Sequence, residues 1–240
     1  MEPLFEILHQ DAGLLVINKP AGLVCHPTKG DEYSSLISRT RLHLGADAKP
    51  HLINRLDRET SGVVLIALDD SVARELRRLW EDRSVRKEYL AIVHGHLKEG
   101  QGSIEAPLGK DEASKIAIKD CVREDGAAAR TDFAVEQHFA RAEGDFSLLK
   151  LWPHTGRKHQ IRIHLAHIGH PIVGDKLYGG DEDLYLALVE DRLTPEQRRR
   201  LILPHHALHA AQVRFNWRGN EHIYNAQPEK WFREFLPTLD

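Results

Sequence analysis

The stretch HLINRLDRETSGVVLIAL, residues 51–68, joins a dense cluster of charge to an apolar run. Its second half, residues 63–68, is short, apolar and rich in β-branched side chains, which is typical of a buried strand. Its first half carries Arg55, Asp57 and Arg58. Two interpretations are compatible with this pattern. One is a solvated turn with exposed ion pairs, each contributing little to stability; the other is a functional loop held at the end of a core strand.

A resemblance favours the second interpretation. The segment RLDRETSG, residues 55–62, resembles the RLDxxTSG motif of the RluA-type RNA pseudouridine synthases. That family usually has His directly before the Arg; this chain has Asn54 there, and a histidine, His51, one turn earlier. In the family the matching Asp is the catalytic residue, so the resemblance implies that role for Asp57.

Four more segments match motifs of the same family. NKPAG at residues 18–22 resembles NKPxG, and Lys87 with Tyr89 resembles KxY. TGRKHQIRIH at residues 155–164 resembles TGRxHQIRxH, and residues 169–179 resemble GHPIxGDxxYG. Family members often carry a small S4-type RNA-binding domain in front of the catalytic domain. Because the motifs begin close to the first residue, we expect a catalytic domain without that module.

The resemblance implies a catalytic set of Asp57, Tyr89 and Arg162. In the family the Tyr stacks against the target uracil, and the Arg that matches Arg162 pairs with the catalytic Asp. The residues themselves point the same way for the arginine. Arg162 lies three residues before Leu165 and so borders the apolar stripe of a predicted helix, where a cation is costly unless a carboxylate pairs with it.

The implied reaction breaks the glycosidic bond of a uridine, turns the uracil and joins its C5 to the sugar. It needs no redox change and no group transfer, so we expect no cofactor and no metal. A stacked target base must be flipped out of the RNA. We expect Arg55 and Arg58 to grip the RNA beside Asp57, with further backbone contacts from Lys19, Lys87, Arg157 and Lys158.

Composition sets limits on the class of protein. The 240 residues include 36 acidic and 33 basic side chains, so any RNA surface must be a local basic patch. Two distant cysteines match no metal or disulfide spacing, which suits a reducing compartment. No apolar run is long enough to span a membrane, and MEPLFEILHQD does not resemble a signal peptide. We expect a soluble, cytoplasmic monomer acting on a stem-loop of ribosomal or transfer RNA.

Two other functions remain as alternatives. The 16 histidines, with His205, His206 and His209 close together, raise the possibility of a metal-dependent hydrolase. A strand is predicted at that place, and no carboxylate or cysteine completes a ligand set. The other alternative is a catalytically inactive RNA-binding module of the same fold, although Asp57, Tyr89 and Arg162 are all present.

The predicted fold is α+β: one catalytic domain over residues 1–240, with a long, mostly antiparallel mixed sheet, flanking helices and a central cleft. The clearest helix begins after Asp69, which supplies a cap. A second helix is predicted to begin at Thr155 as its cap and to end at Gly169, with Ile161, Leu165 and Ile168 facing inward. Residues 111–125 read as a loop or weak strands.

Overall fold

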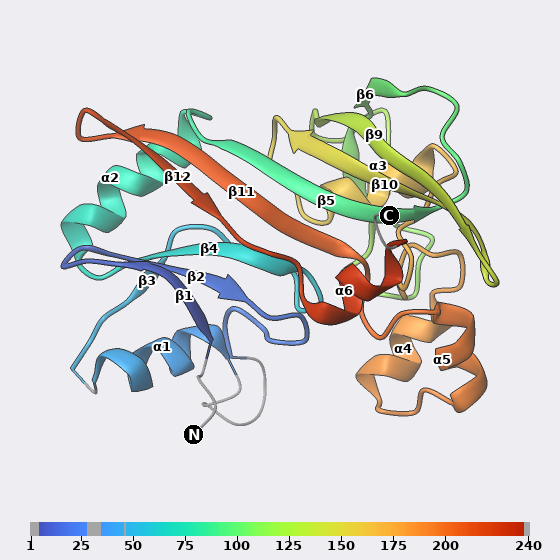
Figure 1. The fold of residues 1–240 in the computed structure, drawn as a ribbon, viewed down its shortest axis with the longest axis horizontal. Helices are drawn as coiled ribbons and strands as arrows, with labels where there is room; N and C mark the ends of the chain where they lie inside the picture. The colour runs from blue at the N-terminus through green and yellow to red at the C-terminus, as the bar shows by residue number, and fades with distance from the viewer. Residues whose placement is uncertain (1–4, 28–34, 46, 238–240) are drawn as a thin grey trace. The chain divides into compact units, whose positions relative to one another are not determined.

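The computed structural model describes residues 5–27, 35–45 and 47–237. It divides into two compact units. The first unit consists of Met1–Glu88 and His209–Lys230, and the second of Tyr89–Leu208 and Trp231–Asp240. The strands pair mostly antiparallel and are flanked by helices (Figure 1), which confirms the predicted α+β class.

The first unit contains a mixed set of paired strands. Four of them follow the order β1, β2, β4, β11; β3 also pairs with β4, and β12 with β11. The β4–β11 pair is parallel and the others are antiparallel. The bounds are β1 Glu6–Gln10, β2 Leu14–Lys19, β3 His51–Leu52, β4 Ser61–Ala67, β11 Leu208–Trp217 and β12 Asn220–Asn225.

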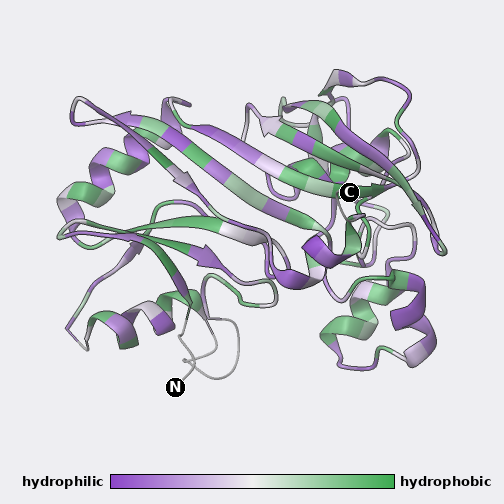
Figure 2. Ribbon diagram, in the orientation of Figure 1, coloured by the Kyte–Doolittle hydropathy of each residue, from purple (hydrophilic) through white to green (hydrophobic). Residues whose placement is uncertain are grey.

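Strand β4 is the centre of the first unit's core. Each of its residues is buried, as the apolar run predicts. Helix α2 (Asp70–Glu81) follows directly, and the Asp69 carboxylate caps it by accepting from the backbone of Ser71 and Val72. Figure 2 shows hydrophobic bands alternating with hydrophilic ones along α2, and the buried residues of this helix are Val72, Ala73 and Leu76. Helix α1 (Leu36–Leu44) is capped by Ser35.

The second unit contains four antiparallel strands in the order β5, β10, β9, β6. Strands β7 and β8 form a separate two-stranded sheet. Strand β8 lies within residues 111–125, where the sequence indicated a loop or weak strands, and β7 comes directly before them. The strand bounds are β5 Arg86–His94, β6 Gln101–Glu105, β7 Leu108–Lys110, β8 Asp120–Val122, β9 Arg130–Arg141 and β10 Gly144–Pro153. The helix bounds are α3 Gln160–His167, α4 Asp183–Val189, α5 Pro195–Leu201 and α6 Lys230–Phe235.

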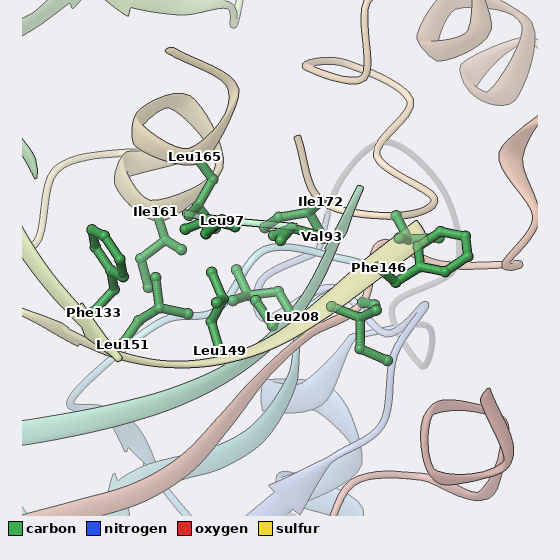
Figure 3. Close-up of a cluster of buried hydrophobic side chains, with 14 of the residues drawn as sticks. Val93, Leu97, Phe133, Phe146, Leu149, Leu151, Ile161, Leu165, Ile172 and Leu208 are labelled. Carbon is green, nitrogen blue, oxygen red and sulfur yellow. The ribbon is translucent and has the colours of Figure 1, made fainter. Parts of the chain in front are cut away.

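The core of the second unit lies between α3 and β10. Ile161 and Leu165 project from α3 toward Leu149 and Leu151 of β10 (Figure 3). Leu149, Leu151 and Leu165 have no exposed surface. This packing fixes α3, and with it the neighbouring Arg162, against the sheet.

The predicted start of the second helix was wrong. Helix α3 begins at Gln160, five residues after Thr155, and His159 occupies the cap position in a left-handed conformation with φ of 55°. The Thr155 hydroxyl instead donates to Gln160 Oε1 at 2.6 Å, so that it closes a loop. Ile168 was also misplaced, because it is 36% exposed and does not face the core. None of the described helices is long and apolar enough to cross a membrane.

Candidate active site

Asp57 lies in the first unit, half-buried in the turn that leads into β4. The peptide groups on both sides of Asp57 are held by the segment around residues 19–25. Cys25 Sγ donates to Leu56 O at 3.3 Å. Gly22 N donates to Arg58 O at 2.8 Å, and Arg58 Nε returns a hydrogen bond to Gly22 O at 3.2 Å. The NKPAG segment therefore fixes the backbone that carries the Asp57 carboxylate.

Lys19 lies buried at the centre of the clamp, by which we mean the hydrogen bonds from residues 19–25 to the carbonyls of Leu56 and Arg58. It is 0% exposed, and its ammonium donates to the carbonyls of Pro20 at 2.9 Å, Leu23 at 2.8 Å and Arg58 at 3.2 Å. The expectation that Lys19 contacts the RNA backbone is therefore wrong for this structure, because all its donors point into the protein. A buried cation with three carbonyl partners positions the loop instead.

The surroundings of the Lys19 ammonium lower its pKa. Burial lowers the pKa of Lys19 to about 8, and the carboxylates of Glu229 and Asp57 oppose that shift. Glu229 also accepts a hydrogen bond from Ala21 N at 2.8 Å. Sequence reasoning missed Glu229, because it lies about two hundred residues from the loop that it holds and carries no local motif.

Asn54, at the position where the family motif usually has His, behaves like an additional peptide group. Its Nδ2 donates to Val63 O at 3.1 Å, and its Oδ1 accepts from Leu65 N at 2.9 Å. Both bonds go to the backbone of β4. The side chain therefore anchors the start of the Asp57 loop to the core strand.

The end of the loop explains its Thr-Ser-Gly sequence. Gly62 has φ of 116°, and a Cβ there would lie 2.2 Å from Ala210 O of the parallel strand β11. Only glycine allows this approach. The Ser61 hydroxyl and His209 Nδ1 share a hydrogen bond of 2.8 Å, and His209 Nε2 lies 3.0 Å from Ala226 O. The buried histidine thus ties β4 to β11 and to the segment that follows β12.

Arg55 and Arg58 are exposed beside Asp57, and their contact with RNA stays a prediction. Lys87 is half-buried at the start of β5. Burial, together with the charge of Arg83, lowers the pKa of Lys87. Tyr89 is half-buried on the same strand, opposite Leu151 of β10, and packs against the core of the second unit.

In the second unit, Arg162 forms an ion pair that sequence reasoning did not predict. Its Nε and Nη2 donate to Asp175 at 2.7 and 2.9 Å. Asp175 Oδ1 also accepts from Leu177 N and Tyr178 N. The Arg162 charge and these hydrogen bonds hold the pKa of Asp175 far below its ordinary value, although burial acts in the opposite direction. Asp175 belongs to the GHPIVGDKLYG segment, and this motif was the sequence signal that could have identified it. The pairing of Arg162 with Asp57 stays a prediction.

The side-chain amide of Gln160 holds the loop before α3 in place through its hydrogen bonds. Gln160 Oε1 accepts from Thr155 and from Arg157 N, while Gln160 Nε2 donates to Arg130 O at 2.9 Å and to Thr131 Oγ1 at 3.0 Å. The side chains of Arg157 and Lys158 are exposed on this loop. Lys158 Nζ is 2.9 Å from Asp120 Oδ1, so an RNA phosphate would have to compete with that carboxylate.

The histidines that suggested a metal are placed separately. His209 lies in β11 with the two partners given above, which confirms the predicted strand. The ring of His205 packs against Trp231. Within residues 5–27, 35–45 and 47–237, no group of three or more His, Cys, Asp or Glu side chains is arranged to hold a metal ion.

Comparisons with known proteins agree on one family. Residues 13–167 match the family model described as RNA pseudouridylate synthase. The dual-specificity RNA pseudouridine synthase RluA of Pasteurella multocida is 38% identical over 215 residues, covering 89% of this chain and 88% of that protein. Uncharacterized RNA pseudouridine synthases of Aquifex aeolicus and Chloroflexus aurantiacus are 36% and 41% identical over 72% and 68% of this chain. The match covers only 55% and 51% of these two relatives, so the chain spans about half their length.

A solved structure supports the same family. Human RNA Pseudouridylate Synthase Domain Containing 1 superposes with a TM-score of 0.74 at 27% identity, covering 100% of this chain and 89% of that one.

Proposed function

The chain belongs to the RNA pseudouridylate synthase family, and on this basis we propose that it is an isomerase that converts uridine in RNA to pseudouridine, with Asp57 as the catalytic residue. The observation that carries the proposal is the clamp on Asp57. Hydrogen bonds hold the carbonyls of both neighbouring residues, Leu56 and Arg58. A carboxylate on so rigid a loop is prepared for chemistry, because it loses little conformational freedom when substrate binds.

The proposed chemistry is carried by the carboxylate. Breaking the glycosidic bond develops positive charge at the anomeric carbon of the ribose. A carboxylate beside that carbon stabilises the charge, bonds to the carbon or removes a sugar proton, as carboxylates do in glycoside hydrolysis. The detached uracil then turns and forms a bond from C5 to the sugar. Atoms and electrons balance within the nucleotide, so the reaction requires no cofactor.

Two further side chains complete the proposed catalytic set. Tyr89 offers a ring face to the detached base and a hydroxyl near the reacting carbon. Arg162 favours the ionised form of Asp57 if the two pair as the family resemblance implies. Around them, Arg55 and Arg58 bind the flipped nucleotide or its neighbours; their exposure beside Asp57 supports this role.

The proposed substrate is a compact stem-loop of ribosomal or transfer RNA. Relatives include a protein named dual-specificity RNA pseudouridine synthase and one named ribosomal large subunit pseudouridine synthase D. The second name supports ribosomal RNA as a substrate class. We further propose that the whole chain acts as one catalytic domain, as a monomer in the cytoplasm. Both cysteines are free thiols, which suits that reducing compartment.

The test is tritium release from RNA that carries 5-tritiated uridine, because C5 loses its hydrogen when it joins the sugar. Asp57→Asn keeps the size of the side chain and removes its charge, so release should stop while RNA binding and folding stay close to wild type. Asp82→Asn is the matched control, since Asp82 is exposed in the same unit. Wild-type release by Asp57→Asn would refute the assignment. RNA binding without release by the wild-type protein would indicate an RNA-binding module.

A further inference from the structure

Strand β6 has one free edge among the described strands. It is the last strand in the order β5, β10, β9, β6, and it pairs with β9 alone (Figure 1). Ala106 N donates to Ala129 O at 3.3 Å, and the register with β9 runs through residues 101–105 without a shift. In such a ladder only every second residue bonds to the partner strand. The peptide groups of Ser103 and Glu105 therefore point away from β9, and in the described part of the chain neither amide has an acceptor.

A pocket of about 380 Å³ lies beside this edge, within the second unit. Residues 102–106 line it consecutively, so the pocket follows the strand and is not confined to one of its faces. The segment before β6, strand β9 and the end of α3 supply the other walls. The apolar lining residues are Leu97, Ile104, Ala106, Phe133 and Ile168, of which Leu97 and Phe133 are labelled in Figure 3. A pocket of this volume is large enough to receive a ligand or a side chain.

The wall of the pocket includes apolar surface that is open to solvent. A Cβ at Gly102 would lie 2.8 Å from the Phe133 ring, so the absence of a side chain there lets the ring reach the strand. Across the pocket, Ile168 is 36% exposed at the end of α3. Covering this surface is favourable. The free peptide groups and the apolar wall would thus be stabilised by the same partner.

The charges of the pocket limit what that partner can be. The lining contains two carboxylates, Glu99 and Glu105, and no lysine or arginine. Glu105 forms an ion pair with Arg130 at 3.1 Å, whereas Glu99 has no ion pair among the described residues. Carboxylates at this place repel an acidic segment and attract a basic one.

The sequence of β6, QGSIE, does little to prevent pairing at its edge. Edge strands are usually protected by a proline, a lysine, a bulge or a covering element. Strand β1, which pairs with β2 alone, has such a bulge between Ile7 and His9. Strand β6 has no bulge, no proline and no lysine, and its single charged residue is Glu105. The edge therefore discriminates by charge and does not exclude pairing as such.

We propose that β6 binds an extended, basic segment of a partner protein by strand addition. The peptide groups of that segment pair with those of Ser103 and Glu105, one of its apolar side chains enters the pocket, and a lysine or arginine contacts Glu99. Because side chains along a strand alternate between two faces, the segment should carry apolar residues at every second position. The inference does not rest on the proposed isomerase activity.

The test is the binding of a fluorescein-labelled peptide of alternating lysine and valine, seven residues long, to the full chain by fluorescence anisotropy. The same peptide with N-methyl groups on two adjacent central residues keeps its side chains but cannot pair at either edge. It should bind at least about tenfold more weakly. A peptide of alternating glutamate and valine should not bind, because its carboxylates meet those of the pocket.

Ser103→Pro is the variant that blocks the edge. It removes an amide that the pairing with β9 does not use, so the sheet should form as before. The affinity for the lysine–valine peptide should fall at least about tenfold. Ser103→Ala is the matched control, because it changes the side chain and keeps the amide, and it should bind like wild type.

A second pair of variants tests the pocket and does not depend on a proline in the strand. Ile168→Ser should weaken binding several-fold by removing part of the apolar wall. Val189→Ser is its control, since Val189 is 61% exposed in the same unit and does not line the pocket. Glu99→Gln should weaken binding and flatten its dependence on KCl.

Hydrogen exchange followed by mass spectrometry locates the bound peptide. Exchange in residues 101–105 should slow, whereas β12, which pairs with β11 alone, should be unaffected. Equal binding of the N-methylated peptide, protection in β12 instead of β6, or no binding up to about 1 mM peptide would each overturn the inference. A wild-type dimer that Ser103→Pro converts to a monomer in sedimentation would assign the edge to a second copy of the chain, and would also overturn it.

Discussion

Arg162 and Asp175 form a bidentate ion pair inside the second unit. The Arg162 Nε to Asp175 Oδ2 distance is 2.7 Å, and the side chains are 7% and 0% exposed. The Arg162 guanidinium also lies 5.0 Å from the centre of the Tyr178 ring. Sequence reasoning recognised that Arg162 needs a carboxylate. The structure supplies Asp175, from the same unit, as one such partner.

Breaking this pair should destabilise the protein strongly. Arg162→Ala leaves the Asp175 carboxylate buried without its cation, and we expect a loss of about 3–5 kcal/mol in the free energy of unfolding. Arg162→Ala combined with Asp175→Asn should recover part of that loss, since no charge is then stranded. Urea unfolding measures both. Simple additivity of the two single changes would contradict the coupling.

The same design tests the predicted pairing of Arg162 with Asp57. If Asp57 also pairs with Arg162, then Asp57→Asn should partly rescue the stability of Arg162→Ala. The control is the combination of Arg162→Ala with Asp82→Asn, which should show no rescue because Asp82 is exposed. For each double variant, the coupling energy is the change in unfolding free energy minus the sum of the changes in its two single variants. Equal coupling energies for the two double variants would show that Asp57 is not a partner of Arg162.

Tyr89→Phe separates stacking from chemistry. The ring remains, so RNA binding should stay within about twofold of wild type, whereas tritium release should fall sharply because the hydroxyl is lost. Tyr89→Leu, which removes the ring face as well, should weaken binding in addition. Normal turnover by Tyr89→Phe would leave Tyr89 as a stacking surface only.

Asn54 should matter through its two backbone bonds. Asn54→Ala leaves Val63 O and Leu65 N without their side-chain partner, at an expected cost of about 1–3 kcal/mol. Asn54→Asp is the sharper variant, because it keeps the acceptor for Leu65 N and places a carboxylate oxygen against Val63 O. It should lose more stability than Asn54→Ala at pH 7. The reverse order in thermal melts would contradict the peptide-like role of the amide.

His209 should make stability depend on pH between about 4 and 6.5. Burial lowers the pKa of His209 from 6.5 to about 4, so the folded protein keeps the ring neutral where the unfolded chain binds a proton. Its contribution, roughly 3 kcal/mol, is fully present above pH 6.5 and is lost as the pH falls toward 4. Urea unfolding of wild type and His209→Asn across this range measures it. An identical pH slope in both proteins would exclude this role.

Local patterns determined a large part of this fold. The apolar run of β4 and the Asp69 cap of α2 each act over a few residues, so the sequence alone predicts them. The start of α3 was not predictable in this way. Thr155 is a good cap by residue type, but its hydroxyl bonds to the Gln160 side chain, and the helix begins at Gln160.

In the candidate site, too, some features follow from local sequence and others depend on contacts between distant segments. Asp57, Tyr89 and Arg162 could be named from the sequence because their motifs are contiguous, and their roles stay predictions. The function of their neighbours was decided by contacts between distant segments. From the sequence alone, Lys19 cannot be distinguished from a lysine that binds RNA. In the structure its ammonium is buried and donates hydrogen bonds to three backbone carbonyls. Glu229 and Asp175 acquire their roles only from the Ala21 amide and the Arg162 guanidinium that folding brings to them. Burial and long-range hydrogen bonding are properties of the packed chain, so only the tertiary structure decides them.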